Sequence, residues 1–494
     1  MRLHQINLFL APALAFSVVL FSNFVPSVFG SYADQRLLLS FFIVSIVTYG
    51  LVRLKNKQRL LLASVDLWPF IPLAIVFFIP LLHIDLSDFF LLEPFLYSLY
   101  VLAFGVSGFL TRIEGYSKDA ATAVTITAIT GCFFYAAITV MIYFFALVDN
   151  FSRLNEMIPW GFVNMRYWSH VATWLLPIFP LCLLIFPWKK NCLWRVAVFF
   201  TAGIWWWILL LSSSRGSIIG LLIGLVFVLA LFGKSAVPWV KVSLKFLAIG
   251  VLIWFVLSLA IPSLVFDDIH VRGLKSDSSG RVVLWNEALA MSLHNFPLGM
   301  GPQSWLTHEI LTDGYQESKK LGHPHNMYLM WAAEYGWISV LLFALLSLVA
   351  FRRLRLQILR VRVSQDANSQ YLVAFTASVI AAFVHAGVSA VFIAPGSMLV
   401  GLCVLSVFWS LIKPGFSMGW PKNTVKESKI CNGAGYVLIG FIAFLNLVWL
   451  FDVFKYHKAM VDDISFYQEE VSLGQLPRFW AHGYFPRHES QMPE

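Results

Sequence analysis

Residues 196–232 read VAVFFTAGIWWWILLLSSSRGSIIGLLIGLVFVLALF, two long apolar runs separated by Ser213-Ser214-Arg215-Gly216. A transmembrane helix needs about 20 mainly apolar residues, so each run approaches the length that crosses a bilayer. Because the connection is so short, it predicts a tight helical hairpin. The same pattern recurs along the chain, which has 494 residues, 59% of them hydrophobic and only 12% charged. Soluble domains have about 25% charged residues. The composition therefore predicts an all-α polytopic integral membrane protein.

Thirteen apolar runs predict about 12–13 transmembrane helices. They cover residues 7–23, 37–52, 67–84, 90–110, 120–147, 169–188, 196–212, 217–232, 246–265, 326–351, 371–393, 397–412 and 434–451. The runs 371–393 and 397–412 are expected to be joined by a tight turn at Ala394-Pro395-Gly396. We interpret the first run as a retained helix, because only Arg2 is basic before it and no clear cleavage site follows.

The basic residues predict which loops face the cytoplasm. With the N-terminus inside, 22 of the 35 Lys and Arg residues fall on the cytoplasmic side, mostly in short loops, in agreement with the positive-inside rule. The formal net charge of +9 therefore has a topological explanation, and we predict membrane lipid but no nucleic acid as a partner. The loop 148–168, the turn at Arg215, the loop after residue 265 and the C-terminal tail are expected to face outward.

This topology divides the chain into four segments. Residues 1–265 form the N-terminal transmembrane helices, 266–325 a polar loop, 326–452 the C-terminal transmembrane helices and 453–494 an outward-facing tail. The loop is the longest polar interval between apolar runs, so we expect it to carry the chemistry. The five cysteines lie in apolar runs or in predicted cytoplasmic loops, so no disulfide framework is expected.

Two arginines stand near predicted outward ends of apolar runs. Arg215 occupies a hairpin tip, and Arg166 precedes the run 169–188 in an aromatic-rich segment. An arginine at membrane depth costs about 2.5–3.5 kcal/mol on insertion scales, which suggests an anionic partner. The alternatives are a snorkelling arginine for Arg215 and an interfacial aromatic belt around Arg166. Together with Arg281, they would supply three guanidinium groups able to clamp a diphosphate bidentately.

The polar loop contains a predicted helix followed by a Gly/Pro segment. Ser278-Ser279-Gly280 predicts a helix start, and the helix over 282–293 has an apolar stripe expected to lie on the protein or the membrane, formed by Val282, Trp285, Leu289 and Leu293. Arg281 then lies in the first turn, where the helix dipole disfavours a cation. It is either an anion-binding residue or an ordinary solvated charge. The segment 297–302, PLGMGP, predicts either an irregular loop that offers backbone amides to an anion or a plain turn.

The sequence His323-Pro324-His325-Asn326 opens the run 326–351. Proline is favoured at the first helical position, which makes His323 a candidate cap and places His325 in the first turn. The dipole there favours a neutral imidazole that can accept a proton as a general base. Two other interpretations remain, namely structural interfacial histidines and a metal site completed by His308. We predict neither metal nor cofactor, because no carboxylate-rich surrounding is evident.

Taken together, these motifs resemble the O-antigen ligase and polymerase superfamily of bacterial envelope glycosyltransferases. The resemblance covers about residues 150–400 and keeps the order of the motifs around one large outward loop. The matching residues are Ser212-Ser-Ser-Arg215-Gly, Arg281-x-x-x-Trp285, Pro297-Leu-Gly299-Met-Gly301, His323-Pro-His325-Asn326 and Glu334-Tyr-Gly336.

The resemblance implies a GT-C-like ligase fold in the bacterial inner membrane, with its active-site loop in the periplasm. It implies transfer of a glycan from undecaprenyl diphosphate to an acceptor such as lipid A-core, without a metal. Carried over, Arg215 and Arg281 are expected to bind the diphosphate, with Arg166 as a third arginine. His325 is expected to be the base, and His323 a supporting residue at the substrate site.

Elementary chemistry agrees with this expectation. A lipid diphosphate leaves readily once arginines neutralise its charge, and an acceptor hydroxyl needs a base to take its proton. A single displacement would invert the anomeric centre. An O-antigen polymerase or a protein O-oligosaccharyltransferase remains an alternative in the same class. A lipid-linked oligosaccharide flippase is the alternative from another class, but it should carry more intramembrane charge than Glu93, Glu334 and Asp452.

Overall fold

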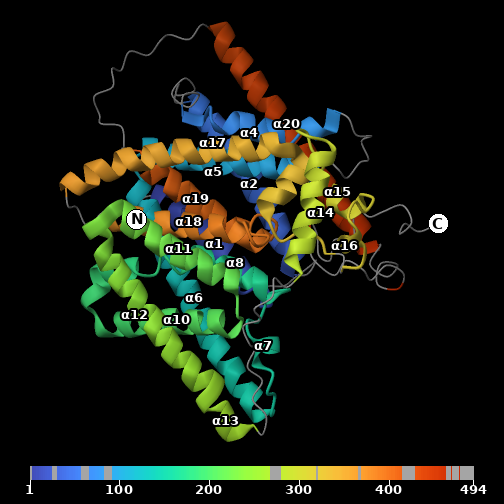
Figure 1. Cartoon of the computed structure of the whole chain (residues 1–494). Helices are drawn as coiled ribbons and strands as arrows, with labels where there is room; N and C mark the ends of the chain where they lie inside the picture. Colours follow the sequence, from blue (N-terminus) through green and yellow to red (C-terminus); the bar gives the residue numbers. More distant parts are fainter. Residues whose placement is uncertain are drawn as a thin grey trace. The chain divides into compact units, whose positions relative to one another are not determined.

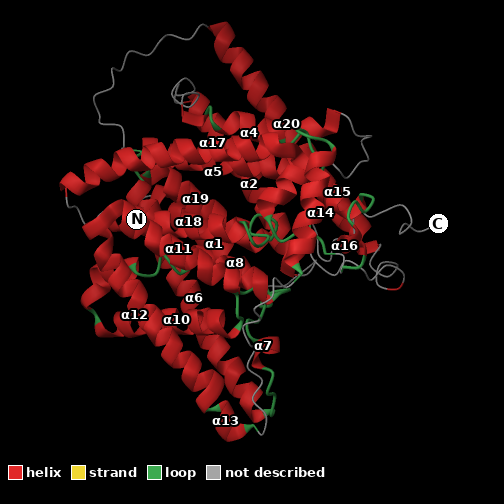
Figure 2. Cartoon of the chain, in the orientation of Figure 1, coloured by secondary structure: helices red, strands yellow, loops and turns green. Residues whose placement is uncertain are grey.

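The computed structural model describes residues 3–24, 31–56, 66–82, 92–266, 280–318, 321–364, 369–413 and 429–462, together with Glu469 and Arg478. Within these residues the secondary structure consists of helices joined by loops and turns (Figure 2). Eight helical segments of this part are long and apolar enough to cross a membrane, and the predicted all-α polytopic fold class is confirmed. Residues 267–279 of the polar loop and nearly all of the tail lie outside the described residues.

The chain forms two compact units, each built from three stretches of sequence. Unit 1 takes residues 1–35, 116–277 and 355–412, and unit 2 takes 36–115, 278–354 and 413–494. The helices of unit 1 are α1 Leu3–Leu20, α6 Ser117–Val148, α7 Leu154–Met157, α8 Met165–Leu175, α9 Leu181–Leu184, η2 Pro187–Lys190, α10 Cys192–Leu211, α11 Arg215–Phe232, η3 Gly233–Ala236, α12 Val237–Phe255, η4 Val256–Ala260, α13 Pro262–Val265, α18 Ser369–Ala386 and α19 Pro395–Leu411.

The predicted hairpin at Arg215 is only partly correct. The turn is as short as expected, because α10 ends at Leu211 and α11 begins at Arg215. However, α11 packs mainly on α18 and α10 packs mainly on α12, so the two helices do not pair with each other (Figure 1). A Cβ atom added at Gly220 would lie 2.5 Å from the carbonyl oxygen of Ala381 on α18. Glycine therefore permits the close approach that selects α18 as the partner.

Unit 2 contains the remaining helices. They are α2 Ser31–Asn56, which begins in unit 1, α4 Phe70–Val76, η1 Ile79–Leu82, α5 Leu92–Ile113, α14 Arg281–His294, α15 Ser304–Thr307, α16 Asp313–Gln316, α17 Met327–Ser364, whose last turns belong to unit 1, and α20 Lys429–Asp462. The helix predicted over 434–451 thus continues past the expected membrane boundary to Asp462.

The predicted spans 67–84 and 169–188 are among those that do not form single helices. The run 67–84 contains the seven-residue α4 and then the short η1, and the run 169–188 is divided between α8 and α9. Prolines explain both breaks. Pro80 lies in η1, while Pro177 and Pro180 lie between α8 and α9. Proline lacks the backbone N–H that an α-helix needs and clashes with the preceding turn. Hydropathy alone does not register this effect.

A buried carboxylate gathers cations at one end of the unit 2 helices. Asp66 accepts hydrogen bonds from Arg112 of α5, from Arg353 of α17 at 3.0 Å and from Lys413 at 2.7 Å. These cations belong to three segments that the positive-inside rule assigns to the same side of the membrane. Because all three cations pair with the same buried carboxylate, Asp66 connects the three segments to each other.

A second buried charge cluster lies toward the other ends of α5 and α17. It contains Glu93 of α5 and Glu334 of α17. Each glutamate is 19 residues away from the arginine of the same helix that pairs with Asp66, namely Arg112 (93 to 112) and Arg353 (334 to 353). At 1.5 Å per residue, 19 residues extend about 28 Å. This length matches the hydrocarbon core of a bilayer, about 30 Å. The two clusters are therefore spaced as the two faces of a membrane would be.

Candidate active site

Two of the predicted arginines lie in unit 1, each in the first turn of a helix. The side chain of Asn164 caps α8 by accepting a hydrogen bond from the backbone N–H of Arg166 at 2.9 Å. Arg215 is the first residue of α11. Both arginines are half-buried. A helix N-terminus attracts anions and disfavours cations, so these positions suit arginines that meet an anionic ligand.

Hydrogen bonds join these two helix starts. The hydroxyl of Ser217 donates to the backbone carbonyl of Ser169 at 3.2 Å and lies 3.3 Å from Nδ1 of His385. The hydroxyl of Ser169 donates in turn to the carbonyl of Arg166 at 2.7 Å. This buried network links the first turns of α8 and α11 to α18, so the structure brings the backbone segments of Arg166 and Arg215 together.

The network includes a pair of buried histidines that sequence reasoning missed. The ring centroids of His170 and His385 are 4.9 Å apart, and Nε2 of His170 lies 2.7 Å from the hydroxyl of Ser389. Both histidines lie on predominantly apolar helices. Ionisable residues inside such segments are functional candidates by default, and this signal would have pointed to them.

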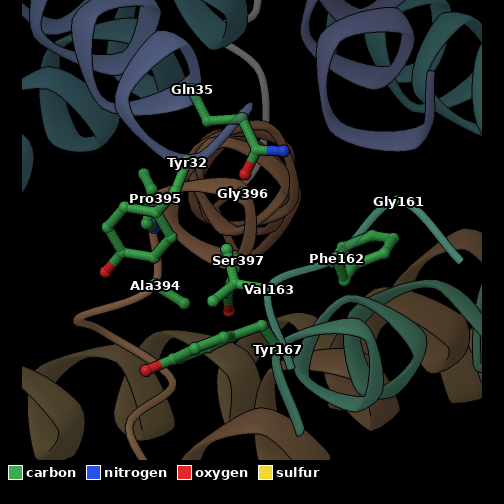
Figure 3. A pocket seen from close by; sticks show the side chains of 10 residues that line it. All are labelled: Tyr32, Gln35, Gly161, Phe162, Val163, Tyr167, Ala394, Pro395, Gly396 and Ser397. Atoms are coloured by element: carbon green, nitrogen blue, oxygen red, sulfur yellow. The ribbon is translucent and has the colours of Figure 1, made fainter. Parts of the chain in front are cut away.

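A pocket lined by Tyr167, the residue after Arg166 in the chain, is formed entirely by residues of unit 1. It encloses about 280 Å³ of space, part of it open to solvent, beside the starts of α8 and α19. Figure 3 shows Tyr32, Tyr167 and Ser397 around it, with the side chain of Gln35 on another side. The rings of the two tyrosines are 5.9 Å apart. The pocket therefore combines aromatic faces with hydroxyl and amide groups, and its Tyr167 adjoins a predicted substrate-binding arginine in the chain.

Arg281 lies in unit 2 and begins α14, where the loop helix was predicted. Gly280 precedes it with φ +73°, a left-handed conformation that glycine adopts without strain. The predicted apolar stripe does not pack on the protein, because Val282, Leu289 and Leu293 are exposed, and contact of this stripe with the membrane stays a prediction. The buried face comprises Leu284, Ala288 and Met291, which pack with Trp305 and Tyr315. Tertiary contacts with α15 and α16 (Figure 1) decide which face is covered.

A buried glutamate organises the loop beneath α14. Glu287 accepts hydrogen bonds from Nε2 of His308 at 2.9 Å, from the backbone N–H of Leu311 at 2.8 Å and from the hydroxyl of Thr312. Nδ1 of His308 also lies 3.0 Å from the carbonyl of Ser304. Both ring nitrogens of His308 are therefore engaged within the loop. Burial, and then the charge of Glu287, raise the pKa of Tyr315 above its usual value.

The Gly/Pro segment uses its backbone amides inside the protein. The N–H of Met300 donates to the carbonyl of Ala333 at 2.8 Å, and that of Gly301 donates to the carbonyl of Glu334 at 2.9 Å. These amides are thus not offered to an anion, as one interpretation of the sequence suggested. They instead fasten the loop to α17. This docking is possible because α17 has non-helical dihedral angles at Gly336 (φ 80°, ψ 165°), which frees carbonyls of the preceding turn.

The two histidines of the HPHN sequence are buried, but the helix does not start where it was predicted. α17 begins at Met327, and the side chain of Asn326 caps it by accepting from the N–H groups of Tyr328 and Leu329 at 3.0 and 3.1 Å. His325 has φ +56°, outside the helical region, so it precedes the cap instead of lying in the first turn. The predicted cap at His323 is therefore wrong, because asparagine is the stronger cap.

His323 nevertheless supports His325 directly. Its Nδ1 accepts the backbone N–H of His325 at 3.1 Å, and the two rings are 4.3 Å apart at a steep angle. Because Nδ1 acts as an acceptor, a proton on the neutral His323 ring must reside on Nε2. This bond holds His325 in its left-handed conformation, which a side chain rarely adopts unaided.

The predicted site residues thus divide between the units. Unit 1 brings the segments of Arg166 and Arg215 together, and unit 2 pairs His323 with His325 and holds Arg281 at the start of α14. Within the described ranges, no group of three or more His, Cys, Asp or Glu side chains has the arrangement of a metal site. Unit 2 also contains a buried arginine, Arg478, that sequence reasoning did not single out.

Comparison with known proteins gives a family match over part of the chain. Residues 197–344 match the family model described as O-antigen ligase. The matched segment contains Arg215, Arg281, both histidines of the HPHN sequence and Gly336. Arg166 lies outside it. No curated protein matches the chain.

Proposed function

We propose that this protein, which matches the O-antigen ligase family model over residues 197–344, transfers a glycan from undecaprenyl diphosphate to a sugar hydroxyl. The acceptor is lipid A-core or another surface glycan. The reaction takes place on the periplasmic side of the bacterial inner membrane and needs no metal. The observation that carries the proposal is the family match over the stretch that contains Arg215, Arg281 and His325.

The arginines are assigned to the diphosphate. Arg215 and Arg281 are each the first residue of a helix, and Arg166 is the second residue of α8. A positive side chain at a helix N-terminus is unfavourable in the absence of an anion, because the helix dipole is positive there. Such positions become favourable when an anion is bound, since guanidinium forks and backbone amides then point to the same charge.

The proposed reaction is one displacement at the anomeric carbon. The acceptor oxygen forms a bond to this carbon while the bond from carbon to the undecaprenyl diphosphate oxygen breaks. The proton of the acceptor hydroxyl passes to the neutral ring of His325, and the electron pair of the broken bond remains on the diphosphate. The arginines stabilise the charge that develops there. The configuration at the anomeric carbon is inverted.

The transfer itself can be tested with purified protein and a synthetic undecaprenyl-diphosphate glycan. Transfer to lipid A-core without added metal would support a ligase. Joining of donor glycans to each other would support the polymerase alternative, and transfer to a protein acceptor would support an O-oligosaccharyltransferase. A deletion strain distinguishes the first two independently, because lost ligation leaves free lipid-linked polymer and lost polymerisation leaves single-repeat caps. Movement of the donor across vesicles without any transfer would favour the flippase.

Replacing Arg215 or Arg281 with lysine should lower kcat/KM by about tenfold or more, because lysine retains the charge but loses the bidentate fork. The measurement is transfer by purified variants at matched protein levels. Arg153→Lys is a matched control, since Arg153 is exposed and pairs only with Glu156, at 3.4 Å, among the contacts described. Full activity of both lysine variants would show that these arginines merely steer the donor.

The topology can be tested by cysteine labelling. Glu309 is exposed in the loop between α15 and α16, and Cys192 is exposed in a predicted cytoplasmic loop. With only Glu309→Cys present, an impermeant thiol reagent should label cells whose outer membrane has been permeabilised. With only Cys192 present, labelling should require lysis of the inner membrane. The reverse result would contradict the periplasmic assignment and the mechanism that depends on it.

A further inference from the structure

Arg478, from the predicted tail, is completely buried in unit 2, with all of its side-chain donors engaged. Nε and Nη2 donate to the two carboxylate oxygens of Glu93 at 3.1 and 3.3 Å, and Nη2 also donates to Glu334. Nη1 donates to the carbonyl oxygen of Gly322 at 3.1 Å and contacts the sulfur of Met330 at 3.2 Å. A guanidinium group has five N–H donors, so this set uses its whole capacity.

The surrounding charges are balanced. Arg36 is also buried and donates from Nη2 to the backbone carbonyl of Arg478 at 3.3 Å. This buried region therefore contains two guanidinium groups and the two carboxylates of Glu93 and Glu334, of which Arg478 pairs directly with both carboxylates. A buried ion cluster of this kind is seldom more stable than well-packed apolar residues. We therefore look for a role of this cluster other than stability, such as holding the surrounding segments in one geometry.

The contacts of Arg478 lead directly to the histidine segment. Gly322, whose carbonyl it binds, immediately precedes His323, and Nδ1 of His323 holds the backbone N–H of His325. Glu334, its other partner, accepts the backbone N–H of Trp305 at 3.2 Å in the loop that the Gly/Pro segment begins. The guanidinium group thus contacts α5, α17 and the residue that precedes the HPHN turn, and Glu334 links it to the loop at Trp305.

We infer that Arg478 is a positioning residue for His325, acting through Gly322 and His323. The inference rests on the proposed function, because it takes His325 to be the base. It gives one residue of the C-terminal tail, Arg478, a part in catalysis, although its guanidinium group is assigned no contact with the reacting atoms. A base displaced by about 1 Å can lose about 100-fold in rate, so a fixed backbone at this turn is sufficient reason for the contact.

Arg478→Lys tests the inference with the charge retained. Lysine has three donors on one nitrogen and cannot serve both carboxylates and Gly322 together. We expect kcat to fall by about 10–100-fold while KM for the lipid-linked donor stays unchanged. Hydrogen exchange of the peptide spanning residues 321–326 should be faster in the variant, since the amide of His325 loses its fixed acceptor. Arg53→Lys is the matched control, because Arg53 forms its ion pair with Glu114 within unit 2 and should affect neither measurement.

The outcomes separate this inference from the proposed function. Unchanged exchange, or faster exchange with unchanged kcat, would overturn the positioning role while transfer by the wild type still stood. Absence of transfer by the wild type would remove the proposed function, and the exchange measurement would then decide alone whether Arg478 holds the segment. If the lysine variant does not fold, Glu93→Gln removes one of the two acceptors that Glu93 offers to Arg478 and keeps the other, and the same two measurements apply.

Discussion

His325→Ala should abolish glycan transfer, with a loss in kcat of about 10²–10⁴-fold, the range that general base catalysis contributes. The acceptor hydroxyl would then have no group to take its proton while the new bond forms. Binding of the donor should survive, because the arginines that are assigned to the diphosphate are unchanged. The measurement is single-turnover transfer alongside equilibrium binding of the lipid-linked donor. Loss of binding together with turnover would mean that His325 is a donor ligand and not the base.

His323 provides the comparison within the same turn. His323→Ala removes the acceptor of the His325 N–H and should leave slower but measurable turnover, whereas His323→Asn retains an oxygen acceptor and should recover part of the loss. If the His325→Ala variant were active and the His323→Ala variant inactive, His323 would be the base and His325 the supporting residue. A chelator should alter none of these results. Inhibition of the wild type by a chelator, with recovery on adding zinc, would contradict the base mechanism itself.

Gly336→Ala should destabilise unit 2 by at least about 3 kcal/mol and remove activity, because two effects combine. Gly336 has φ +80°, a conformation that side chains rarely adopt. A Cβ atom there would lie 2.1 Å from the carbonyl oxygen of Pro297 and 2.5 Å from the carbonyl carbon of Leu298. Neither of these backbone atoms can rotate away, so the loop must separate from α17. The measurement is thermal unfolding in detergent together with transfer.

Gly440 on α20 serves as the matched control. It is helical, and an added Cβ would have no heavy atom within 4 Å, so Gly440→Ala should be neutral or slightly stabilising. Gly299→Ala should behave like Gly336→Ala, because its Cβ would lie 2.5 Å from the backbone nitrogen of Gly336. A Gly336→Ala protein as stable and active as the wild type would show that the loop does not need this approach to α17.

The contact between Gly299 and Gly336 gives a physical reason for motifs that the sequence presents only as patterns. PLGMG and EYG lie more than 30 residues apart in the chain. In the folded protein they form one junction, where the loop donates two hydrogen bonds to the interrupted turn of α17. Each glycine is required because the other backbone occupies the space of its side chain.

The sequence by itself determined the fold class and the type of each main element. Runs of about 20 apolar residues leave the backbone no hydrogen-bond partner in lipid except its own helix, so hydropathy alone identified most of the helices. Local signals also placed the start of α14 at Arg281 and its end before Pro297, because glycine and proline act on neighbouring backbone. The family resemblance was likewise carried by short motifs and is confirmed over residues 197–344.

Tertiary structure alone decided the partners of these elements. Glycine spacing on α11 selects α18 over the adjacent α10, which no local rule predicts. The buried face of α14 follows from what covers it, and the start of α17 follows from the left-handed backbone of His325. Glu93 and Glu334 were visible as charges within apolar runs, but their partner lies 144 residues or more away in the tail. Such a pairing depends on distance in space, because an ion pair is selected by proximity in the folded chain and leaves no local pattern.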